Sequence, residues 1–200
     1  MKIKNIEKVA VLTLGCSKNV VDSENLMGMM RSAGIEIVEN LKQADAIIIN
    51  TCGFVESAKT ESIEAIFEMT EYRRRKSAQK LIVMGCLSER YAESLKNQIP
   101  LIDDIYGVNS YDEVLNALGK KPVQDYGRVL LTPSHYSYLK IAEGCNHKCA
   151  FCAIPSIRGA YRSRTIEELL AEAEKLAASG VKELNIIAQD STYYGKDLYG

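Results

Sequence analysis

Short apolar runs alternate with amphipathic stretches along the first 118 residues of the chain. The runs are rich in β-branched residues and indicate buried strands, whereas the stretches between them repeat their apolar positions at helical spacing. From this pattern we expect strands at 8–14, 35–39, 46–50, 80–84 and 104–107, and helices at 20–32, 55–75, 89–97 and 111–118. Strands that alternate with helices predict an α/β fold with an open parallel sheet.

The periodicity ends near residue 120. Pro122 and Pro133 fall in a stretch with little repetition of apolar positions, so we expect a linker at 121–136, with room for a short hairpin. This linker would separate an amino-terminal domain at 1–120 from a second domain, whose first part occupies 137–200. The sequence therefore predicts two domains.

The second domain begins with one βαβ unit. Its strands are expected at 138–142 and 183–188, with a helix at 166–179 between them. Thr165, followed three residues later by Glu168, forms the capping-box pattern that begins a helix. A strand, a helix and a second strand in this order predict a parallel pair of strands.

Composition narrows the class of protein. Lysine and arginine total 25 against 26 acidic residues, and the net charge of −1 argues against binding nucleic acid by bulk charge. No run approaches the roughly 18 apolar residues of a membrane span. The apolar run near the amino terminus is shorter than a secretory signal requires, so we expect a cytoplasmic protein with reduced cysteines and no membrane partner.

Three cysteines stand close together at Cys145, Cys149 and Cys152, in a C-x3-C-x2-C run. They cannot all be used in disulfides with one another, and they are one short of the four ligands of a structural zinc site. Iron–sulfur clusters are held by cysteines at such short spacings. A four-iron cluster on three cysteines keeps one iron open, so the run predicts a metal site that performs chemistry.

The other three cysteines are far apart in sequence but share a structural position. Cys16, Cys52 and Cys86 each come just after a predicted strand. Because the carboxyl ends of parallel strands meet at one edge of a sheet, we expect these thiols to meet there and hold a second cluster. The alternatives are three cysteines that only fill the core, or, less favoured by the compartment, disulfide pairing.

With both triplets in view, the chain resembles the radical S-adenosylmethionine methylthiotransferases. Phe151 before the last cysteine completes the C-x3-C-x-aromatic-C run of that superfamily. The resemblance extends to the segments 14–19, 21–24, 50–54 and 85–91. The segments 144–159 and 188–192 are most similar to the RimO branch, which methylthiolates an aspartate of a small-subunit ribosomal protein, protein twelve.

The resemblance implies two 4Fe-4S clusters and S-adenosylmethionine as cofactors. Cys145, Cys149 and Cys152 would hold the cluster of a radical S-adenosylmethionine core, a partial (β/α) barrel of which 137–200 is the first part. Cys16, Cys52 and Cys86 would hold an auxiliary cluster in the amino-terminal domain, whose open iron carries the sulfur to be transferred. A second S-adenosylmethionine would supply the methyl group.

Three further residues receive a role through the resemblance. Phe151 would shield the cluster, and Gln189 and Asp190, just after the last predicted strand, would contact S-adenosylmethionine. We expect His147 to serve the loop rather than bind metal. Arg158, with Arg162 and Arg164, is expected to be a solvated charge or to contact a carboxylate of substrate or cofactor.

The expected partners are the ribosomal protein as substrate and an electron donor such as flavodoxin or ferredoxin; the oligomeric state is not predicted. One alternative is the tRNA-adenosine branch of the same family. Another is a non-catalytic metal-binding module or an inactive fragment. Family members continue into a full partial barrel and a small β-barrel module, so we expect this chain to be truncated at its carboxy terminus relative to the family.

Overall fold

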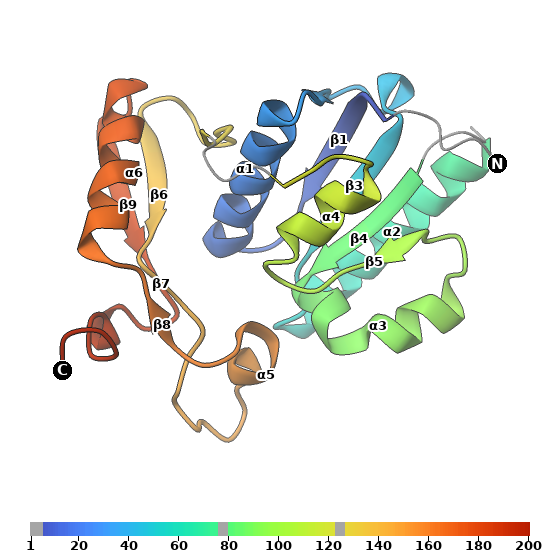
Figure 1. The fold of residues 1–200 in the computed structure, drawn as a ribbon. Coiled ribbons are helices and arrows are strands. Elements are labelled where there is room, and N and C mark those ends of the chain that lie inside the picture. The colour runs from blue at the N-terminus through green and yellow to red at the C-terminus, as the bar shows by residue number, and fades with distance from the viewer. Residues whose placement is uncertain (1–5, 76–79, 123–126) are drawn as a thin grey trace. The chain divides into compact units, whose positions relative to one another are not determined.

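The protein divides into two compact units, Met1–Val129 and Leu130–Gly200. A computed structural model describes residues 6–75, 80–122 and 127–200 (Figure 1). The division falls inside the stretch expected as a linker. Within that stretch, the described residues contain no hairpin, and the first strand of the second unit begins at its last residue, Tyr136.

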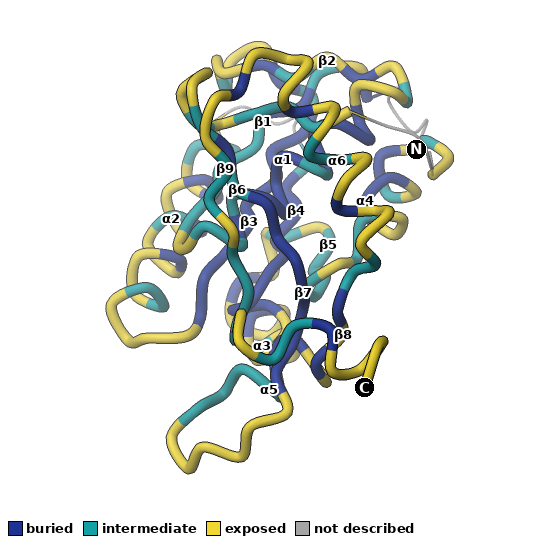
Figure 2. The backbone as a smooth tube through the Cα atoms, turned by 90° about the vertical axis from the view of Figure 1, so that its left-hand side faces the viewer, coloured by how far each residue is buried: buried dark blue, intermediate teal, exposed yellow. Residues whose placement is uncertain are grey.

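The first unit is built on a five-stranded parallel sheet in the order β2-β1-β3-β4-β5. The strands are β1 Lys8–Thr13, β2 Glu36–Ile37, β3 Ala46–Thr51, β4 Lys80–Gly85 and β5 Asp104–Ile105. Every residue of β3 is buried, which explains its continuous apolar run. Figure 2 shows β3 and β4 almost entirely in the colour of buried residues. The predicted α/β fold with an open parallel sheet is confirmed.

Helices cover both faces of this sheet (Figure 1). Ile48 of β3 packs in a core that includes residues of α1 and α4, and its neighbours Ile47 and Ile49 pack in a second core with α2 and α3. This alternation is the two-residue period of a strand buried on both sides. The helices are α1 Ser17–Ser32, α2 Glu56–Arg75, α3 Cys86–Gln98 and α4 Tyr111–Ala117, with a 3-10 turn at Leu41–Gln43.

Two helices begin earlier than the sequence predicted. α1 begins at Ser17 rather than at residue 20, and α3 begins at Cys86 rather than at residue 89. In both cases the chain turns from strand to helix within a few residues, and the first helical turn carries no apolar stripe to reveal it. The earlier starts place Cys16 and Cys86 at the amino ends of helices.

The second unit contains the predicted βαβ arrangement. β6 (Tyr136–Lys140) and β9 (Glu183–Ile187) pair in parallel, and α6 (Ile166–Ala178) crosses between them. The capping box of Thr165 and Glu168 is present at the start of α6. Parallel pairing of two strands joined by a crossover helix is confirmed.

Three short elements between β6 and α6 were not predicted. β7 (Ala142–Glu143) and β8 (Arg162–Ser163) form an antiparallel pair, and α5 (Ile154–Arg158) lies in the loop between them. A 3-10 turn, η2 (Ser191–Tyr193), follows β9. Within the residues that the structure describes, no helix is long and apolar enough to cross a lipid bilayer.

Candidate metal centres

Three adjacent strands of the first unit bring Cys16, Cys52 and Cys86 to one edge of the sheet. Thr51, the last residue of β3, pairs with Gly85, the last residue of β4, and a cysteine directly follows each strand. β1 pairs with β3 on its other side, and Cys16 comes three residues after the end of β1. The register therefore places all three cysteines at the carboxyl ends of neighbouring parallel strands, where ligands bind in open α/β sheets.

The segment before Cys16 packs directly on Cys52. Gly15 has a φ of 90°, and a Cβ atom at this position would lie 2.4 Å from Cβ and 2.8 Å from Sγ of Cys52. Only glycine accepts both this backbone conformation and this close approach. The turn after β1 thus places the residue directly before Cys16 against Cys52.

Two buried polar side chains, Asn19 and Ser62, contact the cysteine segments. The Ser62 hydroxyl accepts a hydrogen bond from the Cys52 N–H (3.0 Å) and donates one to the Cys52 carbonyl (2.9 Å). The Asn19 side chain lies 3.6 Å from Cys86 Sγ through its Oδ1 atom. Sequence analysis did not identify either residue. Their signal is a polar residue on the buried face of a helix, visible once the helix limits are known.

The amino ends of two helices lie at this edge of the sheet and contribute partial positive charge there. Cys16 is the amino-terminal cap of α1, and Cys86 is the first residue of α3. The Cys16 side chain makes no capping hydrogen bond to its helix. The partial positive charge of a helix amino end favours a bound anion, and a thiolate-ligated cluster is such a group.

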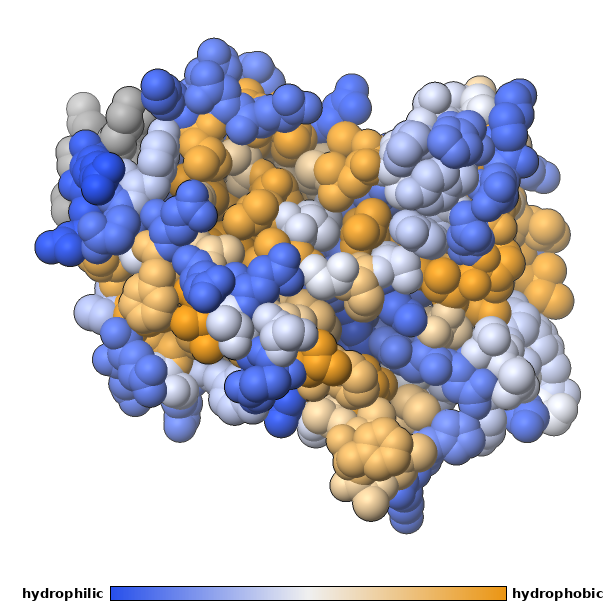
Figure 3. Space-filling model, turned by 180° about the vertical axis from the view of Figure 1, so that it is seen from behind, coloured by the Kyte–Doolittle hydropathy of each residue, from blue (hydrophilic) through white to orange (hydrophobic). Residues whose placement is uncertain are grey.

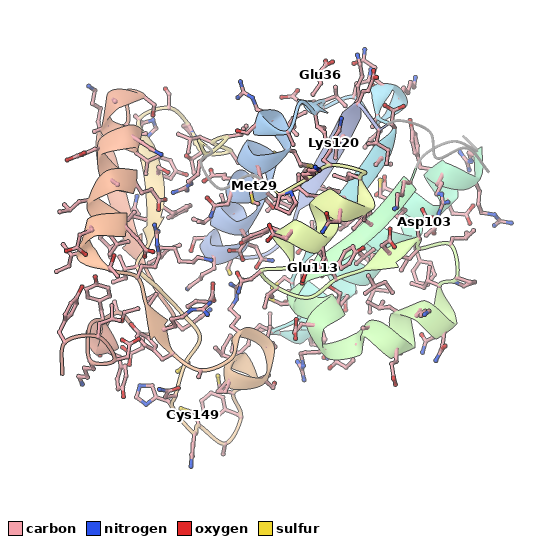
Figure 4. The ribbon with its side chains drawn as sticks, viewed as in Figure 1. Met29, Glu36, Asp103, Glu113, Lys120 and Cys149 are labelled. Carbon is pink, nitrogen blue, oxygen red and sulfur yellow. The ribbon has the colours of Figure 1, made fainter. Side chains whose placement is uncertain are left out.

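The second cysteine triplet lies on the loop that connects β7 to α5 (Figure 4). Cys145 is buried, Cys152 is half-buried and Cys149 is exposed. The Cys145 N–H donates to the Gly159 carbonyl (3.1 Å), and the Cys152 N–H donates to the Cys149 carbonyl (3.1 Å). The first bond and the β7–β8 pair close the loop at its base, and the second forms a turn within it.

A buried ionic cluster ties the two ends of this loop together. Glu143, just before the loop, lies 2.7 Å from Lys140 Nζ and 2.9 Å from Arg158 Nη1. All three residues are buried. One of the two expectations for Arg158, that it is a solvated charge, is therefore wrong. The error arises because its partner is fifteen residues away, across a loop whose closure the sequence pattern does not show.

Phe151 is 91% exposed. It is therefore not a packed core aromatic within its unit, although its role as a shield for a bound cluster stays a prediction. Figure 3 shows apolar side chains gathered at the lower end of the second unit, where the cysteine loop lies in Figure 4. An exposed aromatic side chain next to Cys152 is available to cover a bound group.

Asp190 and His147 connect the cysteine loop to the end of β9. His147 Nε2 lies 2.7 Å from Asp190 Oδ2, and the Thr192 N–H and hydroxyl both donate to Asp190 Oδ1. Hydrogen bonds from His147 and Thr192 lower the pKa of Asp190 to about 2. The carboxylate is thus engaged within the chain, and His147 serves the loop. Gln189, beside it, is half-buried, and its contact with S-adenosylmethionine stays a prediction.

The residues fit an iron–sulfur group by donor chemistry and setting. None of the six cysteines, all within the described residues, forms a disulfide. Thiolates are the ligands that such clusters prefer, and the first triplet also lies beside the amino ends of α1 and α3. Within the same described residues, no group of three or more His, Cys, Asp and Glu side chains is arranged to hold a metal ion. A single metal ion needs all of its ligands around one point. A 4Fe-4S cluster instead takes one thiolate per iron, so its cysteines are spaced by the width of the cluster.

Two family matches cover most of the chain. Residues 8–107 match the family described as uncharacterized protein family UPF0004. Residues 139–199 match the Radical SAM superfamily. The second match implies a 4Fe-4S cluster and S-adenosylmethionine as cofactors.

Curated relatives extend both matches. The chain is 55% identical over 192 residues to "Ribosomal protein uS12 methylthiotransferase RimO" of Aquifex aeolicus, which covers 96% of this chain and 43% of that protein. It is 48% identical over 208 residues to the protein of the same name from Clostridioides difficile, covering 96% of this chain and 47% of that protein. The chain therefore spans less than half the length of these relatives.

A solved structure shares the fold. OxsB, a cobalamin-dependent S-adenosylmethionine radical enzyme, matches with a TM-score of 0.55 and 14% identity, covering 88% of this chain and 32% of that one. Its likeness concerns the fold alone. The two family matches and the curated relatives confirm the resemblance to the radical S-adenosylmethionine methylthiotransferases. The chain belongs to the UPF0004 family, and a radical SAM region follows the UPF0004 domain in its sequence.

Proposed function

We propose that this chain carries the two cluster sites of a radical S-adenosylmethionine methylthiotransferase that modifies an aspartate of ribosomal protein uS12. The observation that carries the proposal is the pairing of two cysteine triplets in one chain, one at the strand ends of a UPF0004 domain and one on the loop of a radical SAM region. The names of the most similar relatives support the substrate.

Cys145, Cys149 and Cys152 would hold the 4Fe-4S cluster that binds S-adenosylmethionine. When bound, this cluster supplies the electron that generates a 5′-deoxyadenosyl radical. The chain contributes a fixed loop, since the Glu143–Arg158 ion pair closes its base. Phe151 would cover the bound group from water.

Cys16, Cys52 and Cys86 would hold the second, auxiliary 4Fe-4S cluster, which provides the sulfur atom. The glycine turn and the helix amino ends at this edge orient the three thiols and stabilise negative charge. Each triplet would leave one iron of a 4Fe-4S cluster without a cysteine, and binding of a small molecule requires such an open position. The two sites thereby differ in task while using the same ligand type.

The remaining assignments complete the proposal. Gln189 would contact the methionine part of S-adenosylmethionine, and Asp190 would do so by exchanging its bonds to His147 and Thr192. A cytoplasmic electron donor such as flavodoxin or ferredoxin would supply electrons, and the protein would work in the cytoplasm where ribosomes are modified. The tRNA-adenosine alternative receives no support from the names of the relatives.

Anaerobic loading of the chain with iron and sulfide, followed by S-adenosylmethionine and a reductant, tests the proposal. With small ribosomal subunits and tRNA both added, mass spectrometry is expected to find one methylthio group on uS12 and none on tRNA. Cys145→Ser is expected to abolish cleavage of S-adenosylmethionine and modification together, whereas Cys52→Ser abolishes modification and leaves the cleavage. A methylthio group on tRNA instead, or cleavage that survives Cys145→Ser, would contradict the assignment.

A further inference from the structure

One buried amide touches all three cysteine segments of the first unit. Asn19, in the first turn of α1, is fully buried. Its Nδ2 atom donates to the Leu14 carbonyl (2.9 Å), two residues before Cys16, and to the Thr51 carbonyl (2.9 Å), directly before Cys52. Its Oδ1 atom lies 3.6 Å from Cys86 Sγ. The three segments come from β1, β3 and β4, up to 67 residues away from Asn19 in sequence.

The orientation of this amide follows from its neighbours. An asparagine amide has two N–H donors, and both are used here on backbone carbonyls. Turning the amide over would place Oδ1 against two carbonyl oxygens, which repel it. The oxygen atom therefore faces Cys86. The opposite orientation of the amide would lose two buried hydrogen bonds.

We propose that Asn19 is the positioning residue of the amino-terminal cysteine triplet: its two amide donors tie the ends of β1 and β3 together beside Cys86, so that the three thiols are spaced for one cluster. The Cys86 thiol donates to Asn19 Oδ1 only while it carries its proton, so the two bonds to the strand ends are the ones that remain when Cys86 binds iron as a thiolate. The inference rests on the proposed function, which assigns these cysteines to a cluster. Residues around metal ligands that orient them in this way commonly change metal affinity about 10–100-fold when substituted.

A control lies in another helix of the same unit. Thr70, in α2, is also buried. Its hydroxyl donates to the Phe67 carbonyl (2.8 Å) within the same helix. Thr70→Ala therefore removes a buried polar side chain that bonds within its own helix, without releasing a strand end next to a thiol.

The test uses the full chain with Cys145, Cys149 and Cys152 replaced by alanine, so that only the amino-terminal triplet binds iron. After anaerobic loading, the iron that resists a chelator is measured for this parent and for its Asn19→Asp, Asn19→Ala and Thr70→Ala derivatives. Asn19→Asp keeps the shape of the side chain but loses both donors. We expect the chelator concentration that removes half of the iron to fall about tenfold or more in both Asn19 variants, and to change little in Thr70→Ala.

A second readout separates positioning from folding. In Asn19→Asp the new carboxylate lies close to the Cys86 sulfur, so the iron that remains bound should have a lower reduction potential than in the parent, with no change in Thr70→Ala. Equal iron retention in parent and Asn19 variants, or equal losses in Thr70→Ala, overturns the role of Asn19. A parent that binds no iron contradicts the proposed function itself.

Discussion

At the scale of single residues, the conformation of Gly15 is required by its contact with Cys52. Gly15→Ala would combine strain at a φ of 90° with a Cβ atom 2.4 Å from Cys52 Cβ. We expect a loss of about 3 kcal/mol or more in the free energy of unfolding, measured by chemical denaturation. Gly34→Ala is the control, because its φ is 81° but no atom lies within 4 Å of the added Cβ. It should cost about 1 kcal/mol, and equal losses at both positions would refute the contact.

The carboxylate of Asp190 gives a prediction in pH. Hydrogen bonds from His147 and Thr192 hold its pKa at about 2, below the ordinary value of 3.8. Because the pKa is lowered in the folded state, the ionised carboxylate stabilises the folded chain above pH 3.8. The folded chain loses this stabilisation as the pH falls towards 2. We expect Asp190→Asn to lower the melting temperature at pH 6, and this deficit to disappear on acidification through that window. A deficit that is constant with pH would contradict the assignment.

At the scale of elements, the loop that carries Cys145–Cys152 depends on the buried pair of Glu143 and Arg158. Arg158→Met removes one partner of Glu143 and leaves this buried carboxylate with Lys140 as its remaining cation. Breaking a buried ion pair lowers the free energy of unfolding by about 3 kcal/mol. We expect faster proteolysis of the loop and weaker iron binding at this triplet. Arg162→Met, at an exposed position in β8, should stay within about 0.5 kcal/mol of the parent in denaturation. Equal effects of the two substitutions would show that the ion pair does not hold the loop.

Some elements of the fold can be predicted from the sequence, and others cannot. The runs of β1, β3 and β4 are predictable because each strand is buried on both faces, and the meeting of their ends follows from parallel pairing alone. β7 and β8 have two residues each and are held by a partner twenty residues away, so no local pattern reveals them. The contacts of Asn19 span 32 and 67 residues, and the burial of Arg158 depends on loop closure. Such side-chain bonds become visible only once the chain is folded.

At the scale of the whole molecule, two units each present three cysteines and each keep their thiols out of disulfides. The account assigns a different task to each triplet, so each should load independently of the other. Replacing Cys16, Cys52 and Cys86 by alanine should leave the visible spectrum sensitive to S-adenosylmethionine. Replacing Cys145, Cys149 and Cys152 should remove that sensitivity while iron stays bound. A response to S-adenosylmethionine that follows the first triplet would reverse the assignment.

The most direct measurement of the central claim is the metal content of the chain after anaerobic loading with iron and sulfide. The account predicts about eight irons per chain, falling to about four when either triplet is replaced by alanine. A stoichiometric zinc with no bound iron, or loss of all iron on replacing one triplet, would contradict two separate cluster sites.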